Sequence, residues 1–352
     1  MCLVKSSAPL FLLTALTAAS QPETAFQWND RGIAATDRRD FTEAAEDYHK
    51  ALDIWRSLGP TYGLHTSTTL YNLAQVDCAV GKWRESVPLF QEAVDLARAA
   101  AGLRNLRTLI SLNGLGKALM VTGDLERAEA AFTEALAAER EVLPDKQELA
   151  QLLGNVASLK MRQGKLAEAL SLGDESLSLT VRNLGEMNAD TATVYTLVAN
   201  IHQRAGRPER ALPLFRKARW IYEKTIPPSD PRYPCMLTSE GLALIDVKQF
   251  RTAEKEMRRA IDLLTPCTTD CEFPLAIAET NFGLLRLTQK KYSEADTWLH
   301  SALVREQKYS VRPNGDMLQT MKLLMDLRQK QGRTAEAAAL RQRIDAVQSA
   351  YR

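Results

Sequence analysis

Side chains that commonly carry out chemistry are few and scattered in this chain of 352 residues. The sequence contains no HExxH motif, no G-x-S-x-G turn and no phosphate-binding loop. Acidic groups such as Glu43, Glu46 and Asp47 have cations nearby and follow helical spacing, which is typical of solvated helix surfaces rather than of acid–base pairs. The sequence therefore predicts a protein that is not an enzyme, has no metal site and needs no cofactor.

Two of the five cysteines, Cys267 and Cys271, enclose the short segment Thr-Thr-Asp between Pro266 and Pro274. In an oxidising compartment this pair could form a disulfide that closes a small loop, and two free thiols are the alternative. The cysteines lack the neighbouring histidines of a zinc site, whose ligands come in sets of about four.

The composition favours helices, and the net charge excludes binding that is driven by the charge of the whole chain. Hydrophobic residues make up 45% of the chain and charged residues 25%, and the net charge of +2 gives no general attraction to nucleic acid or an anionic membrane. Alanine and leucine dominate, and no run alternates apolar and polar residues as a strand would. We expect an all-α fold.

The stretch Gly123–Leu136, GDLERAEAAFTEAL, is repeated with small changes from Gly81, Gly164 and Gly206. Its small residue at position 128 recurs in steps of 41 or 42. The eight equivalents are Ala44, Ser86, Ala128, Ala169, Ala211, Ala253, Ala295 and Ala337. A fixed period of this length indicates a repeat architecture.

Each copy reads as two helices joined by a turn. Twelve positions before this small residue lies a second small residue, except in the eighth copy, which has Met325 there. Four positions after the small residue of the second helix, the side chain is usually bulky. Small residues let the two helices approach closely, and the bulky side chain fills the space beside them. Because one hairpin cannot bury its apolar stripe alone, we expect a right-handed superhelical solenoid of about eight helix-turn-helix repeats. Arg341 stands at a usually apolar position, so the last repeat is expected to be a divergent polar cap.

The order of small residue, glycine turn, alanine, aromatic and alanine resembles the tetratricopeptide repeat. The period is longer than the common one of about 34 residues. The segment Leu58–Ala74, LGPTYGLHTSTTLYNLA, is similar to the longer repeats of kinesin light chains and many bacterial proteins, although it lacks their His-Pro pair. The resemblance covers nearly the whole chain after residue 20, and it implies a fold rather than a particular activity.

The N-terminus differs from the repeats. After Lys5 comes an uncharged apolar run of 12 residues, Ala8–Ala19, followed by Ser20. This pattern is typical of a secretory signal peptide, and it is shorter than the about 20 residues that a membrane-spanning helix needs. A frayed N-terminal helix of a cytosolic protein is the alternative. Because the first repeat helix should begin near Pro22–Ala25, we expect a signal peptide at 1–20 and a solenoid at 21–352, with no membrane span.

The linkers between copies vary more than the helices. Glu141–Gln147 and the proline-rich Ile226–Pro234 are the clearest breaks, and the latter could mark a bend in the solenoid.

In proteins of the resembled family, the first helix of each repeat lines a concave groove, which implies a site for an extended peptide or a partner helix. The phase of the repeat puts nine polar residues of this chain on that surface. They are Tyr71, Asn72, Gln75, Asn113, Lys117, Asn155, Arg162, Asn200 and Arg204. Asn281 repeats the phase of Asn72 and Asn155.

The chemistry of these residues suggests what the groove would bind. Lys117, Arg162 and Arg204 favour an acidic segment or a free carboxylate, and asparagine amides can hold a peptide backbone through both donor and acceptor. Ordinary solvated side chains are the alternative interpretation.

Two functions remain open at this stage. The first is an exported, non-enzymatic protein–protein interaction scaffold. The second is a cytoplasmic regulatory or sensor module that acts with a separate effector chain. Nucleic-acid binding would need paired readout residues at the same place in every repeat and a basic track, and the sequence has neither. The sequence does not indicate an oligomeric state.

Overall fold

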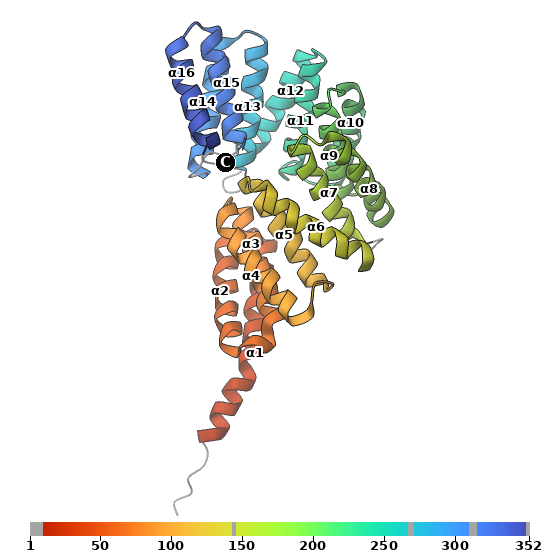
Figure 1. Ribbon diagram of the computed structural model, residues 1–352, viewed down its shortest axis with the longest axis vertical. Helices are drawn as coiled ribbons and strands as arrows, with labels where there is room; N and C mark the ends of the chain where they lie inside the picture. Colours follow the sequence, from red (N-terminus) through yellow and green to blue (C-terminus); the bar gives the residue numbers. More distant parts are fainter. Residues whose placement is uncertain (1–9, 143–145, 267–270, 310–314, 350–352) are drawn as a thin grey trace, which may run out of the picture. The chain divides into compact units, whose positions relative to one another are not determined.

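The computed structural model describes residues 10–142, 146–266, 271–309 and 315–349 (Figure 1). Throughout these ranges the regular structure is helical, with sixteen α-helices and one 3-10 turn. The chain divides into two compact units, residues 1–119 and 120–352, and the boundary falls inside helix α5. We refer to them as unit 1 and unit 2. The expected all-α solenoid of helix-turn-helix repeats is confirmed.

The helices alternate with short turns along the whole described chain. The helices up to the unit boundary are α1 (Leu10–Asp37), α2 (Phe41–Leu58), the 3-10 turn η1 (Pro60–Tyr62), α3 (Gly63–Ala79), α4 (Trp83–Ala101) and α5 (Leu106–Thr122). Those that follow it are α6 (Leu125–Val142), α7 (Gln147–Arg162), α8 (Leu166–Leu184), α9 (Ala189–Arg204), α10 (Pro208–Thr225), α11 (Arg232–Asp246), α12 (Phe250–Leu264), α13 (Glu272–Thr288), α14 (Tyr292–Tyr309), α15 (Gly315–Lys330) and α16 (Thr334–Ser349).

The repeated small and bulky residues pack as expected. All eight small residues of the second helices are buried, and so are bulky partners such as Phe90 and Phe215. A Cβ placed on Gly32 would lie 2.6 Å from Tyr48 Cε1, and one on Gly283 would lie 2.7 Å from Leu299 Cδ2. Glycine in the first helix therefore makes the room that the bulky side chain of the second helix occupies.

The turns within each hairpin use a left-handed backbone. Five glycines expected at these turns have positive φ angles, and they are Gly81, Gly123, Gly164, Gly206 and Gly332. Three repeats place a side-chain-bearing residue at the same point, and Arg39, Lys248 and Lys290 each have φ near 61°. The geometry of the turn is thus kept even where glycine is missing, at a cost in backbone strain.

Three cations, the half-buried Lys160 and the buried Arg286 and Arg328, link neighbouring repeats in unit 2. Each cation lies near the end of the first helix of a repeat. One of its carboxylate partners is on the second helix of the preceding repeat, and the other is on the second helix of the same repeat. The triplets are Glu129–Lys160–Glu168, Glu254–Arg286–Glu294 and Asp296–Arg328–Glu336, with nitrogen–oxygen distances of 2.6 to 3.3 Å. Hydrogen bonds from Lys160 and Gln163 lower the pKa of Glu129 to about 2. His202 holds the same repeat position on α9 and lacks such a pair of carboxylates within the described chain.

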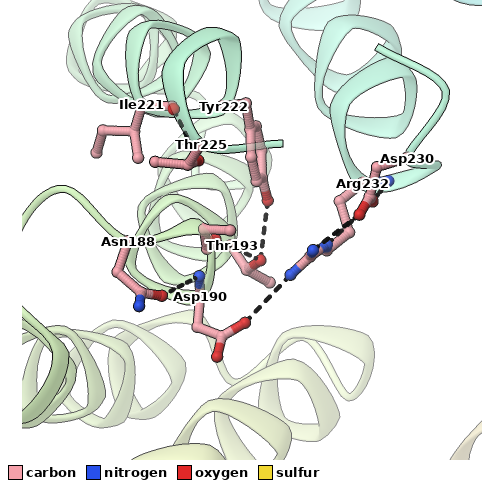
Figure 2. Close-up of polar contacts among 9 residues, drawn as sticks. Asn188, Asp190, Thr193, Ile221, Tyr222, Thr225, Asp230 and Arg232 are labelled. Atoms are coloured by element: carbon pink, nitrogen blue, oxygen red, sulfur yellow. Dashed lines mark hydrogen bonds and ion pairs between the residues drawn. The ribbon is translucent and has the colours of Figure 1, made fainter. Parts of the chain in front are cut away.

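The proline-rich linker before α11 does not divide the solenoid, because unit 2 runs through it as one compact body. Figure 2 shows Arg232 between Asp230 of this linker and Asp190 at the start of α9, with Arg232 Nη1 3.2 Å from Asp190 Oδ1. Asp190 and Arg232 stand one repeat apart, so equivalent positions of consecutive repeats carry opposite charges. The Tyr222 and Thr193 hydroxyls are 2.9 Å apart beside them.

The N-terminal helix differs from the expectation. Helix α1 begins at Leu10 and includes Pro22, so the expected start near Pro22–Ala25 was wrong. Proline removes one backbone donor from a helix, but the apolar residues before it have strong helical propensity and continue the helix. Residues 1–9 lie outside the described chain, and the signal peptide stays a prediction. Within the described residues, no helix is both long and apolar enough to cross a bilayer.

The C-terminal half of unit 2 bears on two further predictions. Arg341 is exposed on α16, as a polar cap requires. Cys271 is buried at the start of α13, whereas Cys267 lies outside the described residues, so their disulfide stays a prediction.

Candidate functional site

Unit 2 contains a groove with a volume of about 810 Å³. It is lined mainly by first helices of successive repeats, namely α7, α9, α11, α13 and α15, together with the last turn of α5. Helix α7 packs on α9, α9 on α11, α11 on α13 and α13 on α15, so the helices follow one another along the groove. The groove therefore runs across the repeats, as a binding site for an extended chain would.

Two arginines lie toward the α7–α9 end of this groove. Arg162 is the last residue of α7 and Arg204 is the last residue of α9, one repeat apart. Both are exposed, and neither forms an ion pair with any residue that the structure describes. The nearby Lys160, by contrast, is paired with two carboxylates. This end of the groove thus carries two positive charges that no described residue neutralises.

Two asparagines line the groove further along. Asn281 on α13 is only 6% exposed, and Asn200 on α9 is half-buried. Their side chains make no hydrogen bond within the described part of the chain. An amide offers two donors and one acceptor with two lone pairs, and leaving such groups unpaired in a sheltered place costs free energy. Both amides are available to a ligand's backbone.

Apolar side chains also line the groove. Met120, Val121, Leu125 and Met161 gather at the α5–α7 end, and Leu242, Ile277 and Leu318 lie along the later helices. Methionine side chains adapt to ligands of different shape. The groove consequently combines apolar surface with a few polar groups, which is the usual composition of a binding site.

The far end of the groove carries a carboxylate. Glu306 on α14 is 2% exposed and accepts a hydrogen bond of 3.0 Å from the Thr320 hydroxyl. The Thr280 and Thr320 hydroxyls are 2.8 Å apart. Glu306 belongs to a later repeat than Arg162 and Arg204.

The sequence-predicted residues of unit 2 mostly reach this groove. Arg162, Asn200 and Arg204 line it, and Asn155 is half-buried on α7 outside the lining. Asn281 lines it as well, and its repeat phase was a sufficient signal for including it. Gln203, which the prediction missed, is held by a 2.8 Å hydrogen bond to Asp246.

The predicted residues of unit 1 make contacts of their own. The Gln75 amide donates to the Tyr71 hydroxyl at 2.7 Å, and the Asn72 amide lies 3.5 Å from Asn29 Oδ1. Burial raises the pKa of Tyr71 above its ordinary value. These contacts account for the polarity of the three side chains, and their role in binding stays a prediction.

The last two predicted residues of unit 1 lie on α5. The Lys117 ammonium is 5.6 Å from the centre of the Trp83 ring, and Asn113 is half-buried. Lys117 belongs to unit 1, whereas Arg162 and Arg204 belong to unit 2. A continuous track of all three cations therefore remains a prediction.

The tetratricopeptide repeat family model matches residues 65–141 and 148–224 of this chain. The photosystem I assembly protein Ycf3 of Cyanophora paradoxa is 26% identical over 125 residues, which are 35% of this chain and 68% of that protein. The matched segments carry the same alternation of small and bulky residues as the rest of the chain.

Solved structures are similar in fold. The Rap conjugation gene regulator of plasmid pLS20, solved in complex with the Phr* peptide, has a TM-score of 0.65 at 13% identity. The alignment covers 87% of this chain and 80% of the regulator. The apo form of RapI has a TM-score of 0.64 at 14% identity, covering 81% and 98%. BtubC from P. vanneervenii has a TM-score of 0.51 at 18% identity, covering 66% and 94%. Residues 65–141 and 148–224 thus carry tetratricopeptide repeats, and the solved structures share the fold of paired helices that the described chain shows.

Proposed function

We propose that this protein is a non-enzymatic interaction scaffold that holds an extended, acidic segment of a partner protein in the groove of unit 2. The observation that carries the proposal is the pair Arg162 and Arg204, which line the groove without a counter-ion in the described chain. A carboxylate of the ligand, from an acidic side chain or a free C-terminus, lies between these two guanidinium groups.

Arginine suits this role because its planar guanidinium group binds a carboxylate through two parallel hydrogen bonds. Charge-assisted hydrogen bonds contribute about 1.5–3 kcal/mol each when they are sheltered from water. The whole chain carries a net charge of only +2, so the attraction is local to the groove.

The remaining lining residues fit an extended backbone. The amides of Asn200 and Asn281 pair with the N–H and C=O groups of the ligand, which an extended chain leaves free. Met120, Met161 and Leu242 contact its apolar side chains. The repeat architecture supports the same conclusion, since a regulator of similar fold has been solved with a peptide.

A display library of random twelve-residue peptides, panned on the full-length protein, supplies the ligand for a direct test. The dissociation constant of the selected peptide is then measured by fluorescence anisotropy for the wild type and for R162Q/R204Q. We expect the double variant to bind at least tenfold more weakly, because both carboxylate contacts are lost. The control is R341Q/R343Q, which removes two exposed arginines of α16 that do not line the groove. Equal affinity of a folded R162Q/R204Q variant and the wild type would refute the proposal.

A regulatory or sensor module with a separate effector chain is the second candidate function. The similarity in fold to a conjugation gene regulator captured with a peptide favours it. In that case the selected peptide should change the affinity of the protein for a second protein. A scaffold would bind its partner through the groove itself, and the peptide would simply compete.

We further propose that residues 1–20 are a signal peptide and that the mature protein is exported. The apolar run Ala8–Ala19 and the small residues that follow it support this assignment. The intact mass of the protein purified from its natural source tests it. A mature chain that starts near Gln21 supports export, whereas an intact Met1 supports a cytoplasmic protein.

A further inference from the structure

Trp220 is an unusually exposed aromatic residue on the second helix α10, with 52% of its surface accessible. On the opposite face of α10, Ala211, Phe215 and Ala218 are buried, so this face packs against the core of unit 2. Arg216 and Lys224 lie one turn before and after Trp220 on the same stripe, and both are exposed. A single exposed apolar residue is common on protein surfaces. Trp220 differs because exposed cations lie one turn before and one turn after it.

The neighbouring second helix α12 extends this surface. Arg259 Nη1 of α12 is 3.5 Å from Glu223 Oε1 of α10, and Arg219 Nη1 of α10 is 3.2 Å from Glu256 Oε1 of α12. These two ion pairs connect side chains of α10 and α12. On α12, Arg251 and Lys255 are exposed one turn apart.

The charge of this surface differs from that of the whole chain. Helices α10 and α12 together contain nine lysines and arginines against five aspartates and glutamates, whereas the chain has a net charge of only +2. Arg216, Lys224, Arg251 and Lys255 form no ion pair with the residues that the structure describes. We name these four cations together with Trp220 the α10–α12 patch. None of its residues lines the groove.

We propose that the α10–α12 patch is a second docking surface, which binds an acidic amphipathic helix of a partner protein independently of the groove. Tryptophan and arginine are the residues that most often dominate protein–protein binding, and they do so where an aromatic anchor is surrounded by polar groups. A helix bound across α10 and α12 can contact the exposed side chains of both helices. Its acidic residues pair with the four cations, and one apolar side chain covers the indole of Trp220.

Two other anionic partners fit the patch less well. Asp262 is exposed on α12 at the position equivalent to Trp220, and Trp220 is the one large apolar side chain exposed on these two helices, both of which are fully described. Bilayer binding scales with inserted apolar area, so an anionic membrane would gain little here. Single-stranded nucleic acid is typically bound by a series of stacking aromatics, and the patch offers one.

The test uses the full-length protein and a synthetic amphipathic helix of leucine, alanine and glutamate with blocked ends. A peptide with glutamine in place of every glutamate serves as the uncharged probe. Binding is measured by fluorescence anisotropy at low and high salt for the wild type, W220A, R216Q/K224Q and R251Q/K255Q. The matched control R341Q/R343Q removes two exposed arginines elsewhere on unit 2.

We expect W220A to weaken binding of the acidic peptide at least tenfold and each double charge variant to weaken it at least threefold. High salt should reduce the affinity of the wild type, because exposed charges are screened. The control and R162Q/R204Q should bind like the wild type, which separates this surface from the proposed groove.

Three outcomes would overturn the proposal. One is equal binding of the acidic and the glutamine peptide. Another is wild-type affinity in folded W220A. The third is tighter binding to vesicles containing 30% phosphatidylglycerol, or to a single-stranded oligonucleotide, with the same loss in W220A, because the patch would then serve a different class of ligand.

Discussion

Glu139 on α6 is a residue whose chemistry depends on its surroundings more than on its type. Its side chain is 1% exposed, and its Oε2 atom has no hydrogen-bond partner among the residues that the structure describes. Burial, with a smaller contribution from Glu148, raises the pKa of this carboxyl to about 7. A charge is therefore disfavoured in the folded protein, and the neutral acid is the stable form at mildly acidic pH.

This shift has a definite sign for stability. A carboxyl whose folded pKa exceeds its unfolded value takes up a proton on folding, so stability falls as pH rises from about 4.5 to about 7. We expect Glu139→Gln to remove this loss and to stabilise unit 2 by about 3 kcal/mol at pH 8 while having little effect at pH 4. Thermal midpoints of the wild type, E139Q and the exposed control E126Q over this pH range measure it. Parallel curves for E139Q and the wild type would contradict the assignment.

At the scale of the element, some turns inside the hairpins place a residue with a side chain in a left-handed backbone conformation that favours glycine. Lys248 and Lys290 adopt φ near 61°, the conformation that glycine holds at the same point in other repeats. A left-handed residue with a side chain costs about 1–2 kcal/mol, partly offset because glycine loses more entropy on folding.

Replacing Lys248 by glycine should therefore stabilise unit 2, by about 0.5–1 kcal/mol. The reverse change, Gly206→Ala at φ 68°, should destabilise it by a similar amount. Both are measured as shifts in the chemical denaturation midpoint. A K248G variant less stable than the wild type would show that another contact of Lys248 outweighs the strain.

At the scale of the whole molecule, the chain behaves as an array of repeats grouped into two compact units. Contacts in such arrays are made mostly between neighbouring repeats, so a local defect need not spread. Gly32 lies in unit 1, far along the chain from the groove residues of unit 2, and it faces the Tyr48 ring.

We expect Gly32→Ala to destabilise unit 1 by about 1–3 kcal/mol, because a methyl group there overlaps the rigid ring of Tyr48. Peptide binding in the groove of unit 2 should be unchanged at temperatures where unit 1 is still folded. Gly63→Ala is the control, since its nearest contact of 3.6 Å is ordinary. Calorimetry and the anisotropy assay together test this, and a matching loss of binding in G32A would argue against independent units.

The sequence by itself determined the repeat, the helical hairpins and their packing residues. The small residue at the Ala128 position recurs in all eight copies, and a bulky residue at the Phe132 position recurs in six of them, because each repeat packs its two helices in the same way. The same arithmetic identified Arg162, Asn200 and Arg204, since a residue's phase on a helix decides which face it occupies.

Only the tertiary structure decided which charges are available to a ligand. Lys160 and Arg162 are two residues apart and equally basic, yet Lys160 is bound by Glu129 and Glu168 while Arg162 meets no counter-ion in the described chain. The carboxylates that make this difference come from helices α6 and α8, and their approach depends on how three helices pack. The phase of a residue on its helix decides which face its side chain occupies. Whether a counter-ion neutralises its charge depends on residues that are distant in sequence.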